Sequence, residues 1–279
     1  KLNIYKTLKS LKHEVTIIGP LRDLYRLPFV IKREFYKSIN KKYDSERNLI
    51  LSKKYSKQIS KIISKKNIDL IFTSDTYLVS LLKTKIPIVL WLDVTYKTYY
   101  DHYFKDRNLH KKSFQEANML EKLALEKSDK IILTSNWSKK ETIKNYKISS
   151  KKIHVIPFGA NFKENKNIKF KKNTSDYCRL ISVGVDWKRK GMDKSIKITK
   201  YLNKKGIKTR LIIIGGKKEI KLPNYIEQVG FLNKNIRKNY NKLKNYYLNS
   251  DFHILMTKSE ACGVVFAEAN SFGLFNITH

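Results

Sequence analysis

Cysteine is scarce in this sequence, which has only Cys178 and Cys262 among its 279 residues. Two cysteines so far apart give neither a disulfide framework nor the close spacing of metal ligands. The six histidines show no metal-ligand spacing either. We therefore expect a chain without a bound metal ion, working in a reducing, cytoplasmic compartment.

Long apolar runs are absent as well. No run approaches the roughly 20 residues that a helix needs to span a bilayer, and no secretory signal peptide is visible. These absences predict a cytoplasmic protein that at most contacts the inner face of the membrane. The first residue is Lys1 rather than Met, so we expect the natural chain to begin upstream.

Acidic side chains are few, since 24 Asp and Glu oppose 59 Lys and Arg and leave a net charge of +35. Such an excess is typical of nucleic-acid-binding proteins. The lysines, however, are spread along the whole chain among Asn, Ile and Tyr, which indicates a composition bias rather than a patch. A solvated basic surface is the first interpretation. A surface that contacts anionic lipid or an acidic acceptor is the second, and a nucleic-acid groove is the third.

The sequence is rich enough in apolar residues for real cores, with 41% hydrophobic and 12% aromatic residues. Short apolar strands alternate with amphipathic helices, a pattern typical of parallel α/β sheets. In the first half the expected strands are residues 15–18, 69–73, 86–91, 130–134 and 153–156. The expected helices are residues 1–12, 29–43, 49–66, 77–82, 111–127 and 137–146, the last capped by Ser135 or Asn136.

The polar, lysine-rich segment 161–175 is predicted to be a linker between a domain of residues 1–160 and one of residues 176–279. In the second half the expected strands are residues 178–183, 210–214, 226–229 and 252–256. The expected helices are residues 192–202, 236–248 and 264–272, the last stopped by Gly273. Because the pattern starts on a helix and ends at His279 where a further strand should begin, both domains are predicted to be cut short.

The strand, loop and helix at residues 252–272 could carry chemistry. Ligands of open parallel sheets bind beyond the carboxyl ends of the strands, and a helix N-terminus attracts a pyrophosphate. Gly263 lets the backbone approach such a group. Glu260 could accept hydrogen bonds from sugar hydroxyls and Glu268 from a ribose diol. Two glutamates eight residues apart are weak evidence alone, and the position on this loop and helix gives them weight.

A second candidate is the loop 183–191, which also follows a strand and precedes a helix. Such a glycine-containing loop can surround a phosphate, and Arg189 and Lys190 would supply positive charge. A basic pair alone says little in a chain with 59 basic residues.

Taken together, these motifs resemble those of glycosyltransferase family 4, retaining enzymes with the GT-B fold. Residues 260–268 match the E-x7-E signature of the family, and residues 183–191 match its loop ending in Lys-Gly. Residues 131–161 resemble its interdomain segment, and residues 8–19 its first helix and second strand. The resemblance implies two Rossmann-like doubly wound domains that face each other across a cleft.

The resemblance also implies roles for residues. Lys190, which matches the lysine of the family motif, would hold the donor diphosphate. Arg189 is expected to assist because it is positively charged and adjacent. Glu260 would contact the donor sugar and Glu268 the nucleotide ribose. Backbone groups at residues 262–264 would contact the phosphates, and the main chain near Phe231 would lie against the base. Gly215 and Gly216, which follow the second expected strand of the second domain, would line the cleft. The other implied donor-site residues are thus Gly184, Gly215, Phe231, Cys262, Gly263 and Val264.

Two departures from the family pattern stand out. Val185 and Asp186 occupy positions where many relatives carry an arginine, which leaves more phosphate charge to Arg189 and Lys190. Leu92 stands where many relatives have a histidine, but the adjacent Asp93 remains. We expect Glu260, Lys190 and Asp93 to be the catalytic residues, with Asp93 facing the cleft near the acceptor.

The implied reaction moves a sugar from a nucleoside diphosphate sugar to a hydroxyl of a glycan or lipid-linked acceptor, with retention, in cell-surface polysaccharide or lipopolysaccharide assembly. No cofactor is expected besides the nucleotide sugar, and no nucleic-acid partner. His102 and His110, in a tyrosine-rich loop at residues 93–110, are candidates for acceptor contact. A nucleotide-sugar epimerase of the same fold, an inactive fragment and a nucleic-acid-binding protein stay open as alternatives.

Overall fold

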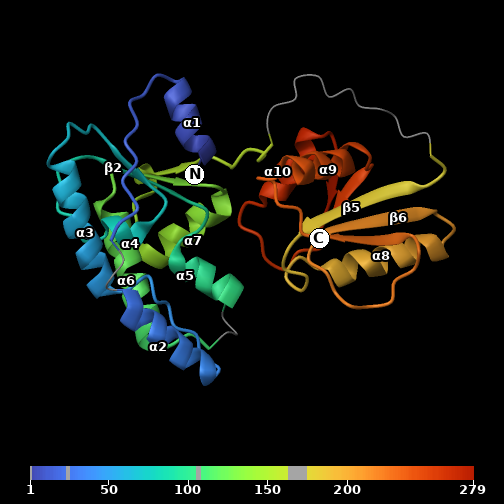
Figure 1. Cartoon of the computed structure of the whole chain (residues 1–279), viewed down its shortest axis with the longest axis horizontal. Helices are drawn as coiled ribbons and strands as arrows, with labels where there is room; N and C mark the ends of the chain where they lie inside the picture. The colour runs from blue at the N-terminus through green and yellow to red at the C-terminus, as the bar shows by residue number, and fades with distance from the viewer. Residues whose placement is uncertain (1, 23–25, 105–107, 163–174) are drawn as a thin grey trace. The chain divides into compact units, whose positions relative to one another are not determined.

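The computed structural model describes residues 2–22, 26–104, 108–162 and 175–279. The chain forms two compact units, unit 1 at Lys1–Ile156 and unit 2 at Pro157–His279, and Figure 1 shows the elements of each. Most of the predicted linker lies outside the described residues, at 163–174. No helix in the described part of the chain is both long and apolar enough to cross a membrane.

Unit 1 contains a parallel sheet with the strand order β1-β2-β3-β4. Its strands are β1 (Ile71–Thr73), β2 (Ile88–Leu92), β3 (Lys130–Leu133) and β4 (Ile153–Val155). Its α-helices are α1 (Leu2–Ser10), α2 (Leu27–Ser38), α3 (Leu49–Ile63), α4 (Thr76–Val79), α5 (Tyr96–Tyr99), α6 (Lys111–Lys127) and α7 (Asn136–Tyr146). A π-helical turn η2 (Tyr100–Phe104) and a 3-10 turn η3 (Ser150–Lys152) complete it.

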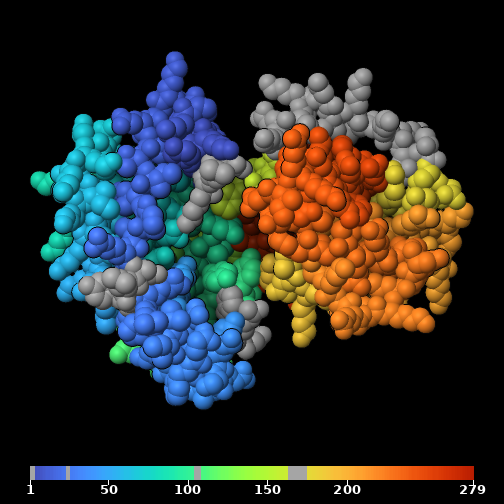
Figure 2. Space-filling view, viewed as in Figure 1, coloured from blue at the N-terminus to red at the C-terminus, as the bar shows by residue number. Residues whose placement is uncertain are grey.

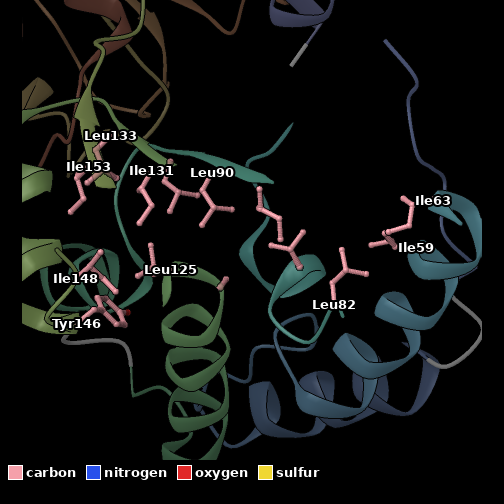
Figure 3. Close-up of a cluster of buried hydrophobic side chains, with 14 residues drawn as sticks. Ile59, Ile63, Leu82, Leu90, Leu125, Ile131, Leu133, Tyr146, Ile148 and Ile153 are labelled. Carbon is pink, nitrogen blue, oxygen red and sulfur yellow. The ribbon is translucent and has the colours of Figure 1, made fainter. Parts of the chain in front are cut away.

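The core of unit 1 lies on one face of this sheet. Alternate residues of β2 are buried there, as the period of a strand requires. They pack with residues of α3, α4, α6, α7, β3 and β4 (Figure 3). The cluster consists of Ile59, Ile63, Val79, Leu82, Ile88, Leu90, Leu92, Ala124, Leu125, Ile131, Leu133, Tyr146, Ile148 and Ile153.

The strand predicted at residues 15–18 does not form, and that prediction was wrong. The segment is irregular backbone, although Ile18 and Leu21 pack against the core of unit 1. Burial of apolar side chains needs no ladder of hydrogen bonds, so the apolar pattern alone could not establish a strand. The Ser135 cap is confirmed, because its hydroxyl accepts a hydrogen bond from the N–H of Ser138 (3.1 Å) at the start of α7.

Within the tyrosine-rich segment predicted as a loop, residues 96–104 are helical and form α5 and η2. The fully buried carboxylate of Glu121, on α6, accepts hydrogen bonds from the Thr76 hydroxyl and from the N–H of Tyr96 (3.0 Å). His110 caps α6 by accepting from the N–H of Ser113 (3.4 Å). This capping gives His110 a structural role that the sequence did not reveal.

Unit 2 contains a second parallel sheet, with the strand order β7-β6-β5-β8-β9. Its strands are β5 (Cys178–Gly184), β6 (Thr209–Gly215), β7 (Ile226–Gly230), β8 (Phe252–Ile254) and β9 (Phe275–Ile277). Its helices are α8 (Met192–Lys204), α9 (Arg237–Leu248) and α10 (Val264–Ser271).

Helices cover both faces of the second sheet (Figure 1). On one face, Met192 and Ile196 of α8 pack against Leu180 and Leu211. On the other face, Leu243 and Tyr247 of α9 and Ala269 of α10, with Phe272 after it, pack on the strand residues Ile181, Val183 and Ile214. This arrangement is a doubly wound sheet, as expected.

The end of the chain differs from the prediction in one respect. A further strand was expected only beyond His279, but β9 already pairs in parallel with β8, matching Phe252 with Phe275. Gly273 follows α10 as predicted, and its N–H donates to the carbonyl of Asn270 (2.9 Å).

Candidate donor-binding site

The strand order of unit 2 reverses at β5. The chain passes from β5 to β6 and β7 on one side of the sheet, and β8 and β9 lie on the other side. Loops that leave neighbouring strands in opposite directions open a crevice at their carboxyl ends, where doubly wound proteins bind ligands. The strand order of this sheet places that crevice between the loop after β5 and the loop after β8. These are the two loops that the sequence singled out separately.

Gly191 brings the two loops together. Its φ of +67° is a left-handed conformation, and a Cβ at this position would lie 1.9 Å from the carbonyl oxygen of Met256. Next to it, the carbonyl of Arg189 accepts from the N–H of Lys258 (2.7 Å) and from the Thr257 hydroxyl (3.2 Å). The two loops therefore form one connected structure, and only glycine fits their closest approach.

Lys190 and Glu260 meet in this crevice, although 70 residues separate them. The Lys190 ammonium donates to Oε2 of Glu260. The aliphatic part of Lys190 packs against Gly184, since a Cβ at Gly184 would lie 2.6 Å from Cγ of Lys190. Arg189 Nη1 lies 3.4 Å from the same carboxylate oxygen and donates to the carbonyl of Ser259 (3.0 Å). The site thus combines two cations with one carboxylate.

Asp186 organises the loop that carries these cations. Its Oδ1 accepts from the N–H of Arg189 (2.9 Å), and its Oδ2 lies 3.8 Å from the Arg189 guanidinium. The sequence suggested only that this position lacks an arginine found in relatives. The structure shows that the aspartate fixes the turn from which Arg189 projects.

The start of α10 supplies the uncharged part of the site. Gly263 is the N-cap residue, and a Cβ there would lie 2.4 Å from the Phe266 ring and 3.0 Å from Cγ of Glu260. The first N–H groups of a helix have no acceptor within the helix, so Val264 presents its backbone beside the carboxylate loop. Cys262 immediately precedes this helix start and is partly exposed.

Glu268 is enclosed on α10, since only 1% of its surface is exposed. Lys234, from the segment after β7, donates to Oε1 of Glu268. The Tyr247 hydroxyl of α9 donates to Oε2 (3.4 Å), and burial together with the nearby carboxylate raises the pKa of Tyr247. A ribose that reaches Glu268 would therefore have to displace Lys234.

Replacing Lys234 with methionine is expected to destabilise unit 2 by about 1–3 kcal/mol, because the buried Glu268 carboxylate loses its cation. Chemical denaturation measures the change. Lys238→Met, at an exposed position on α9, is the matched control and should change stability by less than about 0.5 kcal/mol. Equal stability of the two variants would show that the ion pair contributes nothing.

His253, in β8, lies in the core beside the site. Its Nδ1 pairs with Asn276 Oδ1 at 2.6 Å, and burial, with a smaller contribution from Lys190, lowers its pKa to about 4. An unfolded chain binds a proton at the ordinary pKa near 6.5, so the folded state loses stability as the pH falls from 6.5 towards 4. His253 therefore has a structural role in the core of unit 2.

Stability is therefore expected to decline by roughly 3 kcal/mol over that acidic window on account of His253 alone. His253→Gln should remove this component of the pH dependence, and the exposed His154→Gln should leave it in place. Urea denaturation at a series of pH values distinguishes the two variants. A profile of His253→Gln that keeps the wild-type slope would contradict the assignment.

The remaining predicted residues lie at or near the ends of strands, Gly215 and Phe231 in unit 2 and Asp93 in unit 1. Gly215 ends β6 next to Gly184, and a Cβ there would lie 2.3 Å from the Gly184 carbonyl oxygen. Phe231 follows β7 and is highly exposed. Asp93 follows β2 in unit 1, where its Oδ1 accepts from the Thr134 hydroxyl (2.8 Å).

Among the solved structures that this chain resembles are several glycosyltransferases. The lipopolysaccharide outer core galactosyltransferase WaaB matches with a TM-score of 0.57 and 14% identity, over 82% of this chain and 61% of that one. A mutant of S. aureus TarM in complex with fondaparinux, alpha-GlcNAc-glycerol and UDP matches with a TM-score of 0.51 and 11% identity, over 82% and 44%. A Rickettsia africae glycosyltransferase matches with a TM-score of 0.50 and 15% identity, over 99% and 68%.

The two parallel α/β units and these likenesses define a protein with the GT-B glycosyltransferase fold. The sequence model for glycosyltransferase family 4 matches residues 2–164, and that for glycosyl transferases group 1 matches residues 163–279. The chain belongs to glycosyltransferase family 4. It spans 61% of the WaaB chain and 44% of the TarM chain. Among curated proteins, none matches the sequence at a significant level.

Proposed function

We propose that unit 2 binds a nucleoside diphosphate sugar in the crevice after β5 and β8, and that the protein transfers the sugar to a hydroxyl acceptor. The observation that carries this proposal is the convergence of Lys190, Arg189 and Glu260 at the point where the strand order reverses. Two cations beside a helix start suit a diphosphate. A carboxylate that they hold in place suits the hydroxyls of the attached sugar.

The proposed chemistry follows from where charge develops. The bond that breaks joins the anomeric carbon to a phosphate oxygen, so negative charge accumulates on the departing diphosphate. Lys190, Arg189 and the backbone N–H groups at Val264 would stabilise this charge. The departing diphosphate would accept the acceptor's proton on the face where the new bond forms, which retains the anomeric configuration. No side chain is then required as a nucleophile, and alignment of the two substrates supplies much of the remaining rate.

Other residues take supporting parts in this proposal. Glu268 would bind the ribose after Lys234 moves aside, and Phe231 and Gly215 would border the base and the crevice. Asp93 would serve on the acceptor side. The S. aureus TarM structure in complex with UDP supports a nucleotide-linked donor. The likeness to WaaB, a lipopolysaccharide outer core galactosyltransferase, supports a part in surface polysaccharide or lipopolysaccharide assembly. The proposed acceptor is a glycan or lipid-linked hydroxyl, and the proposed compartment is the cytoplasm.

A thermal-shift screen against nucleoside diphosphates and their sugars tests the donor site. At least one compound should raise the melting temperature of the wild-type chain, and Glu260→Ala should weaken the shift by the sugar more than the shift by the bare diphosphate. If no diphosphate stabilises the chain, the donor site is wrong.

Product analysis then separates the remaining enzymes. A transferase needs an added acceptor and yields a glycoside whose anomeric configuration is read by NMR, whereas an epimerase produces an isomeric nucleotide sugar without an acceptor. A chain that binds the donor but performs neither reaction fits an inactive fragment. Duplex DNA binding that falls steeply with salt, without any diphosphate shift, would favour a nucleic-acid protein instead.

A further inference from the structure

The Glu268 carboxylate has both of its oxygens occupied by side chains of unit 2. Oε1 accepts from the ammonium of Lys234, and Oε2 accepts from the hydroxyl of Tyr247 at 3.4 Å. The side chain of Glu268 is only 2% exposed, whereas that of Lys234 is 27% exposed. A ribose diol needs the same carboxylate oxygens as acceptors for its two hydroxyls. The ion pair with Lys234 and a bound ribose therefore exclude each other.

Lys234 is the partner that is free to move. Tyr247 is fully buried on α9, and its ring stacks on that of Phe272 with the centroids 5.1 Å apart. Lys234 lies between β7 and α9, outside helix and strand, and its side chain reaches solvent. Figure 2 shows the surface that the neighbouring helix α9 contributes to unit 2, in orange. A ligand that arrives from solvent can therefore displace Lys234 without disturbing the core.

A second contact holds Lys234 over the carboxylate. Its ammonium lies 4.6 Å from the centroid of the Phe162 ring, a distance at which a cation and an aromatic face attract each other. Phe162 is fixed in turn by edge-to-face contacts with Tyr247 at 5.7 Å and with Phe272 at 4.9 Å. The ammonium is thus held by a carboxylate and by an aromatic face, and both contacts are lost when it leaves.

We propose that Lys234 competes with the ribose of the donor for Glu268 and thereby limits the affinity of unit 2 for its nucleotide. This rests on the proposed function, which takes Glu268 as the ribose acceptor. A ligand that binds only the form of a protein in which its site is open has its apparent affinity reduced by the population of that form. After sugar transfer, the return of Lys234 to Glu268 favours release of the nucleoside diphosphate, a step that limits the rate of many enzymes.

The competition predicts an effect opposite in sign to that of simple electrostatics. A lysine beside an anionic ligand ordinarily strengthens its binding, so that removal of the lysine weakens it. Lys234→Met removes the competitor instead, and the affinity for a ribonucleoside diphosphate should rise about tenfold. A 2′,3′-dideoxynucleoside diphosphate lacks the hydroxyls that displace Lys234, so its affinity should change by less than about twofold.

Isothermal titration calorimetry of the full chain tests the proposal. The probes are the diphosphates of uridine, cytidine, adenosine and guanosine, each compared with its 2′,3′-dideoxy counterpart. Lys234→Gln keeps a hydrogen-bond donor beside Glu268, decides the question if the methionine variant fails to fold, and should raise ribonucleotide affinity about threefold. Lys238→Met, at an exposed position on α9, is the matched control and should bind both forms within about twofold of wild type.

Each outcome decides for or against the competition. A gain confined to the ribonucleotides supports it, including the case in which only the Lys234 variants bind measurably. Unchanged affinity in these variants, weaker binding of both nucleotide forms, or a gain shared by the dideoxy forms would overturn it, while nucleotide binding by the wild type would leave the donor site standing. If neither the wild type nor the variants bind any of the probes, the donor site fails and the competition fails with it.

Discussion

Lys190→Met is expected to lower sugar transfer by about 10²–10³-fold, because it removes the cation placed to meet charge on the departing diphosphate. Methionine keeps most of the stem that lies against Gly184, so the loop should keep its shape. Initial rates at limiting donor, together with the affinity for the bare nucleoside diphosphate, measure the effect. We expect both to fall, with the larger loss in the rate.

Lys188→Met is the matched control, since Lys188 lies in the same loop but is exposed. Its transfer rate should stay within about threefold of wild type, as expected for a solvent-screened charge. A melting curve of Lys190→Met checks that the unpaired Glu260 has not unfolded unit 2. If the folded Lys190→Met chain transfers at the wild-type rate, the phosphate role of Lys190 is disproved.

Gly191→Ala is expected to be the most damaging small substitution in unit 2. The new methyl group would meet the Met256 carbonyl oxygen at 1.9 Å, from a residue with φ of +67°. Overpacking and the left-handed conformation together should cost about 3–4 kcal/mol, which corresponds to a fall of roughly 10 °C in melting temperature. Loss of the contact between the two loops should also abolish diphosphate binding.

Gly206→Ala separates the two causes. Gly206 has φ of +82°, but nothing lies within 4 Å of the added Cβ. Its cost should therefore be only the conformational part, about 1–2 kcal/mol, with diphosphate binding intact. Equal destabilisation by the two variants would show that the contact with Met256 is unimportant.

Much of the fold could be predicted because its signals are local. Helix α6 forms over the residues that its apolar spacing indicated, Lys111–Lys127, and the strands of unit 2 fall near the predicted runs. The strand at residues 15–18 failed for a physical reason. A strand exists only where a partner supplies hydrogen bonds, and apolar residues such as Ile18 can be buried without one. The helix α5 was missed since aromatic residues in a short segment show no clear period.

The site was predictable in part. The sequence placed Lys190 and Glu260 in two donor-site motifs, but it could not show that they pair across the point where the strand order reverses. Lys234 was missed because it is one of 59 basic residues and carries no motif. The enclosure of Glu268 could not be foreseen either, since it depends on Tyr247 and Lys234 arriving from other elements.

Glu121 connects two segments of unit 1 that are far apart in the sequence. One carboxylate on α6 holds the Thr76 hydroxyl at the start of α4 and the N–H of Tyr96 at the start of α5, so the segments after β1 and β2 share an anchor. A graft that exchanges one of these segments must keep a donor for Glu121, or the other segment loses its support. A redesign of unit 1 should therefore exchange α4, α5 and α6 together, because the Glu121 carboxylate connects all three.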